Sequence, residues 1–264
     1  MEKIIVITTT KDQSSALITD TLNQIRAEHL CHDLKRIDID YNNACNELQY
    51  GMDSIKHVII SNRGGQKGMH GFIAERAQVH ISNSNALVNG KKPMYTLLDD
   101  NGPTDYLCGD TLIQQKACRS GGMLGLDHVQ NHANTYAFYV NAGGIYQIPK
   151  DFFETYSRLL HTPESIATKM RNDDYKLWQK IHTFAQENPD ITIEPMVVTY
   201  DEIQASTIQE TLMQVSEDHI RIRKERTKEA VSLHKSTFKE GVMRQIILTS
   251  GYTNAAFYYL IYSD

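Results

Sequence analysis

The sequence predicts an α/β fold with a central mixed sheet. Short runs rich in β-branched residues, such as KIIVITT (residues 3–9) and IKHVIIS (residues 55–61), are typical of strands. Between such runs, apolar residues recur every three or four positions, which is typical of helices. A Gly109-Asp110 pair joins two further extended segments and predicts a hairpin. Strands that alternate with helices favour a sheet covered by helices.

Composition is that of an ordinary globular protein, with 264 residues, 41% hydrophobic residues and a net charge of -5. This balance argues against a protein that coats nucleic acid through its overall charge, although a local basic groove stays possible. The four cysteines lack CxxC spacing, so neither a structural zinc site nor a disulfide framework is indicated. We expect a cytoplasmic protein that is not membrane-embedded, because the first residues resemble a strand more than a signal peptide and no long apolar run follows.

Residues 1–62 predict a small α/β unit. Strands are expected at residues 3–9, 34–39 and 55–61, with a helix between the first two. The glycines that follow, at positions 64, 65 and 68, do not fit the spacing of a phosphate-binding loop. They predict a sharp turn, and they make an enzyme acting on nucleotides the least favoured interpretation.

Residues 63–151 predict a second unit with the order helix, strand, strand, strand, helix, strand. Phe72, Ile73, Ala77 and Ile81 form an apolar helical stripe. Three strands are expected at residues 95–98, 106–108 and 112–117, then a helix over residues 125–140 and a strand at residues 145–148. The order is that of a mixed sheet with helices packed on it.

Residues 152–264 predict a mainly helical C-terminal region. A helix over residues 152–186 is interrupted at Thr162-Pro163, and Pro195 restricts residues 191–200 to an edge or irregular strand. From Asp201 a long helix is expected whose apolar residues recur at near-heptad spacing, which predicts a homo-oligomer or a partner protein bound through these helices. The basic run HIRIRKERTK is either a solvated face or a contact with nucleic acid or an acidic partner, and the apolar final stretch needs a surface to cover it.

The predicted hairpin carries the residues that point to chemistry. Gln114 and Lys116 face the same side, because side chains alternate along a strand. Asp105 on the partner strand lies close to both if the register places it on that face. A carboxylate, an amide oxygen and an ammonium would then meet at one edge of the sheet, where they can hold a divalent metal and orient a water.

Pro103, Asp105 and the run Gln114-Gln115-Lys116 resemble the motif of the PD-(D/E)XK nucleases, in the Mrr-like variant with Gln in place of the second acid. The element order of residues 68–148 is similar to the core of that superfamily, and Glu75 lies on the first helix, where many members place an additional acid. The resemblance implies a PD-(D/E)XK-like αβββαβ core and a metal-dependent endonuclease that hydrolyses DNA, for example a bacterial restriction, antiphage-defence or toxin effector.

The same resemblance implies a role for each residue. Asp105, Gln114 and the backbone carbonyl of Gln115 would hold Mg²⁺ or Mn²⁺, with help from Glu75. Lys116 would orient or deprotonate the attacking water, or offset charge in the transition state. The phosphates of DNA would contact a set of basic residues, namely Arg63, Lys67, Arg76 and Arg119.

Several alternatives stay open. The acids and Lys116 are otherwise solvated or turn-forming residues, and the four basic residues are otherwise surface charges. Asp99 and Asp100 are most simply turn formers. One of them would replace Asp105 as the metal ligand if the Asp105 side chain faces away from Gln114 and Lys116. Three histidines could lie near the site: His70, His128 and His132. Finally, Gln114 in place of an acid leaves open a catalytically inactive scaffold or an oligomerising component of a multi-protein complex.

Overall fold

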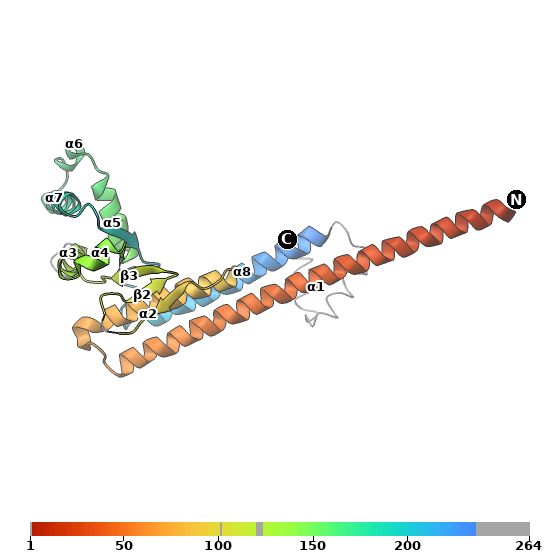
Figure 1. Cartoon of the computed structure of the whole chain (residues 1–264), viewed down its shortest axis with the longest axis horizontal. Helices are drawn as coiled ribbons and strands as arrows, with labels where there is room; N and C mark the ends of the chain where they lie inside the picture. The colour runs from red at the N-terminus through yellow and green to blue at the C-terminus, as the bar shows by residue number, and fades with distance from the viewer. Residues whose placement is uncertain (1, 101, 120–123, 236–264) are drawn as a thin grey trace. The chain divides into compact units, whose positions relative to one another are not determined.

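The structure is a computed structural model that describes residues 2–100, 102–119 and 124–235, and of residues 2–19, 66, 67 and 235 only the backbone (Figure 1). Its helices are α1 (Glu2–Ile60), α2 (Gly65–Val88), α3 (Leu126–Thr135), α4 (Ala137–Asn141), α5 (Lys150–Leu160), α6 (Glu164–Ala167), α7 (Asn172–Glu187) and α8 (Ile208–Lys235). Its strands are β1 (Tyr95–Leu97), β2 (Tyr106–Cys108), β3 (Thr111–Gln115), β4 (Ile145–Ile148) and β5 (Thr192–Pro195).

The chain divides into two compact units. The smaller comprises residues 1–43, 88–90 and 218–264, and the larger comprises residues 44–87 and 91–217. The boundaries expected after residues 62 and 151 do not coincide with this division, because α1 and α8 each contribute residues to both units. All strands of the described chain lie in the larger unit.

The expected α/β unit at residues 1–62 is wrong, since this segment is the single helix α1. Buried residues of α1 recur at steps of three, four or seven along its described length, which is a helical period; they include Leu30, Leu34, Ile37, Ala44, Leu48, Ile55 and Val58. Each β-branched window is short enough to resemble a strand by itself. The longer apolar stripe overrides that local preference.

In the smaller unit, α1 packs against α8 through Leu30, Leu34 and Val231. The Arg226 guanidinium donates to Asp40 Oδ2 at 2.8 Å, and Arg223 donates to Asp38 at 2.9 Å. Val231, late in α8, packs beside Leu30 and Leu34, whereas the earlier Arg223 and Arg226 pair with residues further along α1, so these segments are antiparallel. Residues 236–264, including the apolar final stretch, lie outside the described residues.

The larger unit is built on a five-stranded mixed sheet in the order β1-β2-β3-β4-β5. β1, β2 and β3 pair antiparallel, whereas β4 runs parallel to β3 and β5 parallel to β4. The hairpin turns at Gly109, whose φ of 60° is one that glycine adopts at little cost. Over residues 65–148 the order helix, strand, strand, strand, helix, strand is the expected one, except that the second helix is divided into α3 and α4 at Tyr136.

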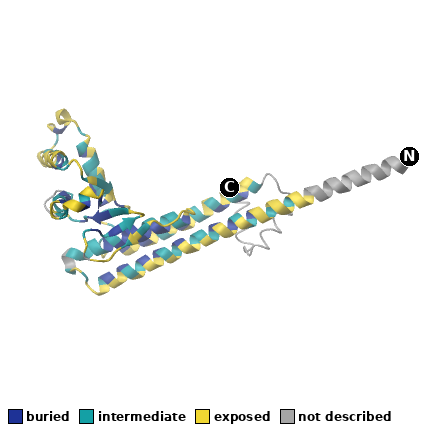
Figure 2. Cartoon of the chain, in the orientation of Figure 1, coloured by how far each residue is buried: buried dark blue, intermediate teal, exposed yellow. Residues whose placement is uncertain are grey.

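Helices cover both faces of this sheet, and the strands at its centre are largely buried (Figure 2). On one face, Val79 of α2 packs against Tyr106 and Ile113. On the other face, Tyr146 and Ile148 of β4 join a core that includes residues of α3, α5 and α7. Helices therefore pack on both faces of the sheet that contains the β2-β3 hairpin.

The region after residue 151 completes the same sheet and core. β5 pairs with β4, as expected of an edge strand that contains Pro195. Trp178, Ile181 and Phe184 of α7 are buried in the core beside β4. The long helix begins at Ile208, after turns at the residues where it was expected to start. None of the described helices is both long and apolar enough to cross a membrane.

Candidate functional site

A cavity of about 330 Å³ lies in the larger unit beside the β2-β3 hairpin. It collects residues from α2, the loop after β1, the hairpin and α3. Its polar lining consists largely of residues singled out by the sequence: Arg63, His70, Glu75, Asp99, Asp100, Asp105, Gln114, Gln115, Lys116 and His128. The fold thus brings all the expected catalytic and metal-binding residues to one cavity.

Hairpin register places Asp105 beside Gln114. Tyr106 pairs with Ile113, and the Asp105 N–H donates to the Ile113 carbonyl at 2.9 Å, so the next residues outward are opposite each other. Asp105 Oδ2 accepts from the Gln114 amide at 2.6 Å and from the Gln115 N–H at 2.7 Å. These two donors fix the carboxylate at the end of the hairpin.

Gln114 has one amide atom without a partner. Its Oε1 is buried and accepts no hydrogen bond, while its Nε2 binds Asp105. An amide oxygen that lacks a donor is a suitable ligand for a hard cation. Asp105 Oδ2 and the Gln115 carbonyl both face the Gln114 Nε2, at 2.6 and 3.4 Å, so the amide would have to turn over for its oxygen to join them around a divalent metal. The described residues contain no group of three or more His, Cys, Asp or Glu that could hold one.

Gln115 ties the hairpin to α2. In the orientation that satisfies both amide atoms, its nitrogen donates to the Ala74 carbonyl and its oxygen accepts from the Glu75 N–H, each at 3.2 Å. This contact anchors the helix that carries Glu75 beside Asp105. Alternation along β3 then leaves Gln114 and Lys116 on the opposite side from the Gln115 side chain.

The charges of Lys116 and Asp105 each affect the pKa of the other side chain. Burial lowers the pKa of Lys116, and the neighbouring carboxylate of Asp105 partly offsets that effect. Burial raises the pKa of Asp105, against the stabilising contacts from the Gln115 N–H, Lys116 and Gln114. A lysine whose ammonium is destabilised by burial is better suited than a solvated one to exchange a proton.

Glu75 is the most strongly shifted acid in the cavity. Burial first, and then the charge of Asp105, raise its pKa from 4.5 to about 8, against the opposing effect of Arg76 and Arg63. Its side chain is only 17% exposed. A carboxyl group with such a pKa is a typical feature of functional sites, because it can hold a proton near neutral pH.

Asp99 links two of the arginines that were expected to bind phosphate. Its Oδ1 lies 2.8 Å from Arg63 and 3.0 Å from Arg76. Arg76 is buried and also donates to Ser54 and to the Phe72 carbonyl. Arg76 is absent from the cavity lining, and its three hydrogen bonds inside the protein argue against a contact with phosphate. Arg63 is half-exposed, lies over the Phe72 ring and remains at the cavity wall.

The other two basic residues are not placed in the cavity. Arg119 is 68% exposed, lies near Asp201 and over the Tyr200 ring, and is not part of the cavity lining. Lys67 belongs to α2, but its side chain lies outside the described part of the structure. Of the four expected phosphate contacts, Arg63 alone is seen to line the cavity.

The histidines divide into two groups. His70 and His128 line the cavity. His132 lies behind it, where its Nδ1 is 2.9 Å from the Tyr146 hydroxyl and where burial, followed by the charge of Lys116, lowers its pKa to about 4. His132 is therefore neutral at physiological pH and supports the β4 side of the site.

Sequence reasoning missed the support from β4 and α3. Tyr146 pairs with Gln114 across β3 and β4, so the two side chains share a face of the sheet. Gly125, with a φ of 80°, starts α3 where an added Cβ would lie 3.2 Å from the Lys116 carbonyl. A glycine directly before an apolar helical stripe was the available signal for this close approach.

Comparisons of the chain with protein-family models, with curated proteins and with solved structures find no match.

Proposed function

We propose that this chain is a metal-dependent endonuclease that hydrolyses phosphodiester bonds in DNA. The observation that carries the proposal is the convergence of Asp105, Gln114, Lys116 and Glu75 on one cavity. The motif resembles that of PD-(D/E)XK nucleases, and the mixed sheet and element order are compatible with that core. The role in restriction, antiphage defence or toxicity is proposed by analogy alone.

Each residue has a distinct task in this proposal. Asp105, the unpaired Oε1 of Gln114 and the Gln115 carbonyl would hold Mg²⁺ or Mn²⁺, with Glu75 as the further acid. When bound, such a cation supplies charge stabilisation to the phosphoryl oxygens. Lys116 accepts a proton from the attacking water or donates a hydrogen bond to the phosphate, and Arg63 binds a neighbouring phosphate.

Cleavage of supercoiled plasmid in the presence of Mg²⁺ or Mn²⁺ tests the proposal. We expect nicked or linear product from the wild-type protein and a loss of at least about 100-fold for Lys116→Ala or Asp105→Asn, the usual scale for a catalytic group. Arg119→Ala, at an exposed position outside the cavity, is the matched control and should cleave normally. Equal cleavage by wild type and Lys116→Ala would remove this site from the reaction.

A second candidate function is a catalytically inactive scaffold or oligomerising component that keeps the nuclease-like architecture. It is favoured by Gln114, which stands in place of the second acid of the motif and presents its amide nitrogen to Asp105. Gln114→Glu should create cleavage activity if the substitution alone abolished it. Light scattering that gives a monomer, with no partner co-purifying, would count against the scaffold.

A further inference from the structure

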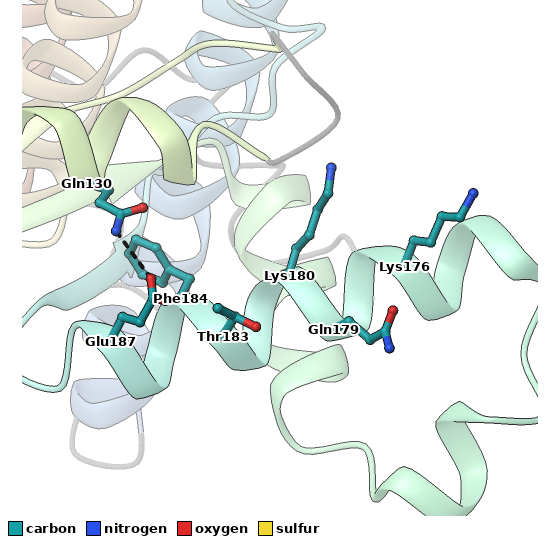
Figure 3. Close-up of a pocket in the computed structure, with 7 residues that line it drawn as sticks. All are labelled: Gln130, Lys176, Gln179, Lys180, Thr183, Phe184 and Glu187. Atoms are coloured by element: carbon teal, nitrogen blue, oxygen red, sulfur yellow. Dashed lines mark hydrogen bonds between the residues drawn. The ribbon is translucent and has the colours of Figure 1, made fainter.

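A second concave surface lies in the larger unit, between α7 and α3. It is a groove of about 300 Å³ whose floor includes the buried Phe184 and whose rim carries Lys176, Lys180 and Gln130 (Figure 3). Apart from one carboxylate at its end, its polar groups are ammonium, amide and hydroxyl groups. Such a lining suits an anionic, hydrogen-bonding ligand.

The two lysines are arranged as a pair. They are one helical turn apart on α7, both are exposed, and Figure 3 shows their amines extended to the same side of the helix. Residues spaced by four lie about 6 Å apart on a helix, which is close to the separation of neighbouring phosphates along one strand. Among the described side chains, no ion pair engages either amine.

Helix α3 connects this groove with the catalytic cavity. His128 lines the cavity and Gln130 lines the groove. Residues two apart on a helix are about 200° apart around its axis, so the cavity and the groove flank opposite sides of α3. A helix is about 10 to 12 Å wide, so a strand of a few nucleotides is long enough to cross it.

We infer that this groove binds the phosphodiester backbone of the DNA whose scissile bond occupies the cavity, with Lys176 and Lys180 each contacting a phosphate. The inference rests on the proposed function, and it extends the substrate from one phosphodiester to a strand that crosses α3. Glu187, which accepts a hydrogen bond from Gln130 at 3.5 Å, is the acid at the end of the groove and opposes this binding.

The experiment measures the affinity of a fluorescent 20-base-pair duplex as a function of salt, in Ca²⁺ to limit cleavage. Replacing both lysines, as Lys176→Gln with Lys180→Gln, should reduce the slope of log affinity against log salt by about 1 to 2, since each phosphate contact contributes about 0.9. Gln has nearly the helix propensity of Lys, so α7 should stay folded. Glu187→Gln should raise the affinity. The control has the same change in charge and replaces two exposed lysines that line neither the cavity nor the groove, as Lys91→Gln with Lys92→Gln.

Hydrolysis of bis-p-nitrophenyl phosphate separates this inference from the proposed function, because that small diester needs only the cavity. Unchanged turnover of the diester together with a reduced salt slope for DNA supports the inference. An unchanged salt slope in the Lys176/Lys180 variant, or an equal reduction of the slope in the Lys91/Lys92 control, overturns the inference that the groove binds DNA. Neither result contradicts the proposed nuclease function. A wild-type protein that binds DNA through the groove but hydrolyses neither substrate overturns the proposed function alone. A wild-type protein that does not bind DNA overturns both.

Discussion

Glu75 and Arg76 are neighbours in the sequence, but their side chains meet different surroundings. Glu75 lines the cavity, where burial and the charge of Asp105 favour its protonated form. Arg76 is turned into the protein, where Asp99, Ser54 and a carbonyl accept its hydrogen bonds. The first residue is therefore available for chemistry, and the second positions the loop that carries Asp99.

Glu75 should make stability depend on pH. Its pKa is raised in the folded state to about 8, so the folded protein retains a proton that the unfolded chain releases above about pH 4.5. Stability is therefore lost as the pH rises through this window. Urea denaturation should show that Glu75→Gln, relative to wild type, gains about 1 to 3 kcal/mol between pH 5 and pH 8. The exposed Glu154→Gln should show no such trend, and a similar trend in both variants would contradict the assignment.

Arg76 should matter for stability and not for DNA contact. Arg76→Met leaves the Ser54 hydroxyl and the Phe72 carbonyl without their donor, and we expect a loss of about 2 to 4 kcal/mol in the free energy of unfolding. Arg119→Met, at an exposed site, should change it by less than about 0.5 kcal/mol. If the Arg76→Met protein is folded and has normal stability but binds DNA more weakly, then Arg76 contacts the DNA after all.

The pairing of Asp105 with Gln114 could be predicted because the hairpin fixes it locally. A two-residue turn at Gly109-Asp110 sets the register, and alternation then decides which side chains share a face. The fate of Arg76 could not be predicted in this way. Its burial depends on Ser54 of α1 and on Asp99, which are 22 and 23 positions away.

At the scale of elements, α1 shows why local propensity failed. Within residues 34–39, Ile37 and Ile39 are two positions apart, which in a short window is compatible with an alternating strand. In the structure Leu34 and Ile37 are buried while Ile39 is 58% exposed. A strand would place Ile37 and Ile39 on the same face, whereas a helix separates them by about 200°.

This difference gives a direct test of α1. Ile37→Ala should reduce the free energy of unfolding by about 2 to 4 kcal/mol, because it removes a buried side chain, while Ile39→Ala should have an effect below about 0.5 kcal/mol. Chemical denaturation of the two variants, with circular dichroism as the probe, provides the measurement. Equal losses at the two positions would favour the strand.

At the scale of the whole molecule, the proposed catalytic residues and residues 152–217 belong to one compact unit. β4, which pairs with the Gln114 strand, is itself paired with β5. α7 buries Trp178, Ile181 and Phe184 in the core that also contains Tyr146. Sequence motifs predict a candidate site, but they do not show which later segments complete the sheet, because those contacts join residues far apart in the chain.

A fragment containing residues 63–151 should therefore fail to fold, although it contains every expected catalytic residue. It lacks β5, α7 and nearly all of α5, so one edge of β4 is left unpaired and one face of the sheet keeps only the cover of α3 and α4. We expect poorly dispersed amide signals by NMR and no cooperative thermal transition, whereas residues 44–217 should show both dispersion and cooperativity. Because β5 supplies backbone hydrogen bonds directly to the strand beside Gln114, a folded and cooperative 63–151 fragment would mean that the sheet is stable without its last strand. The site would then depend on the hairpin and α2 alone.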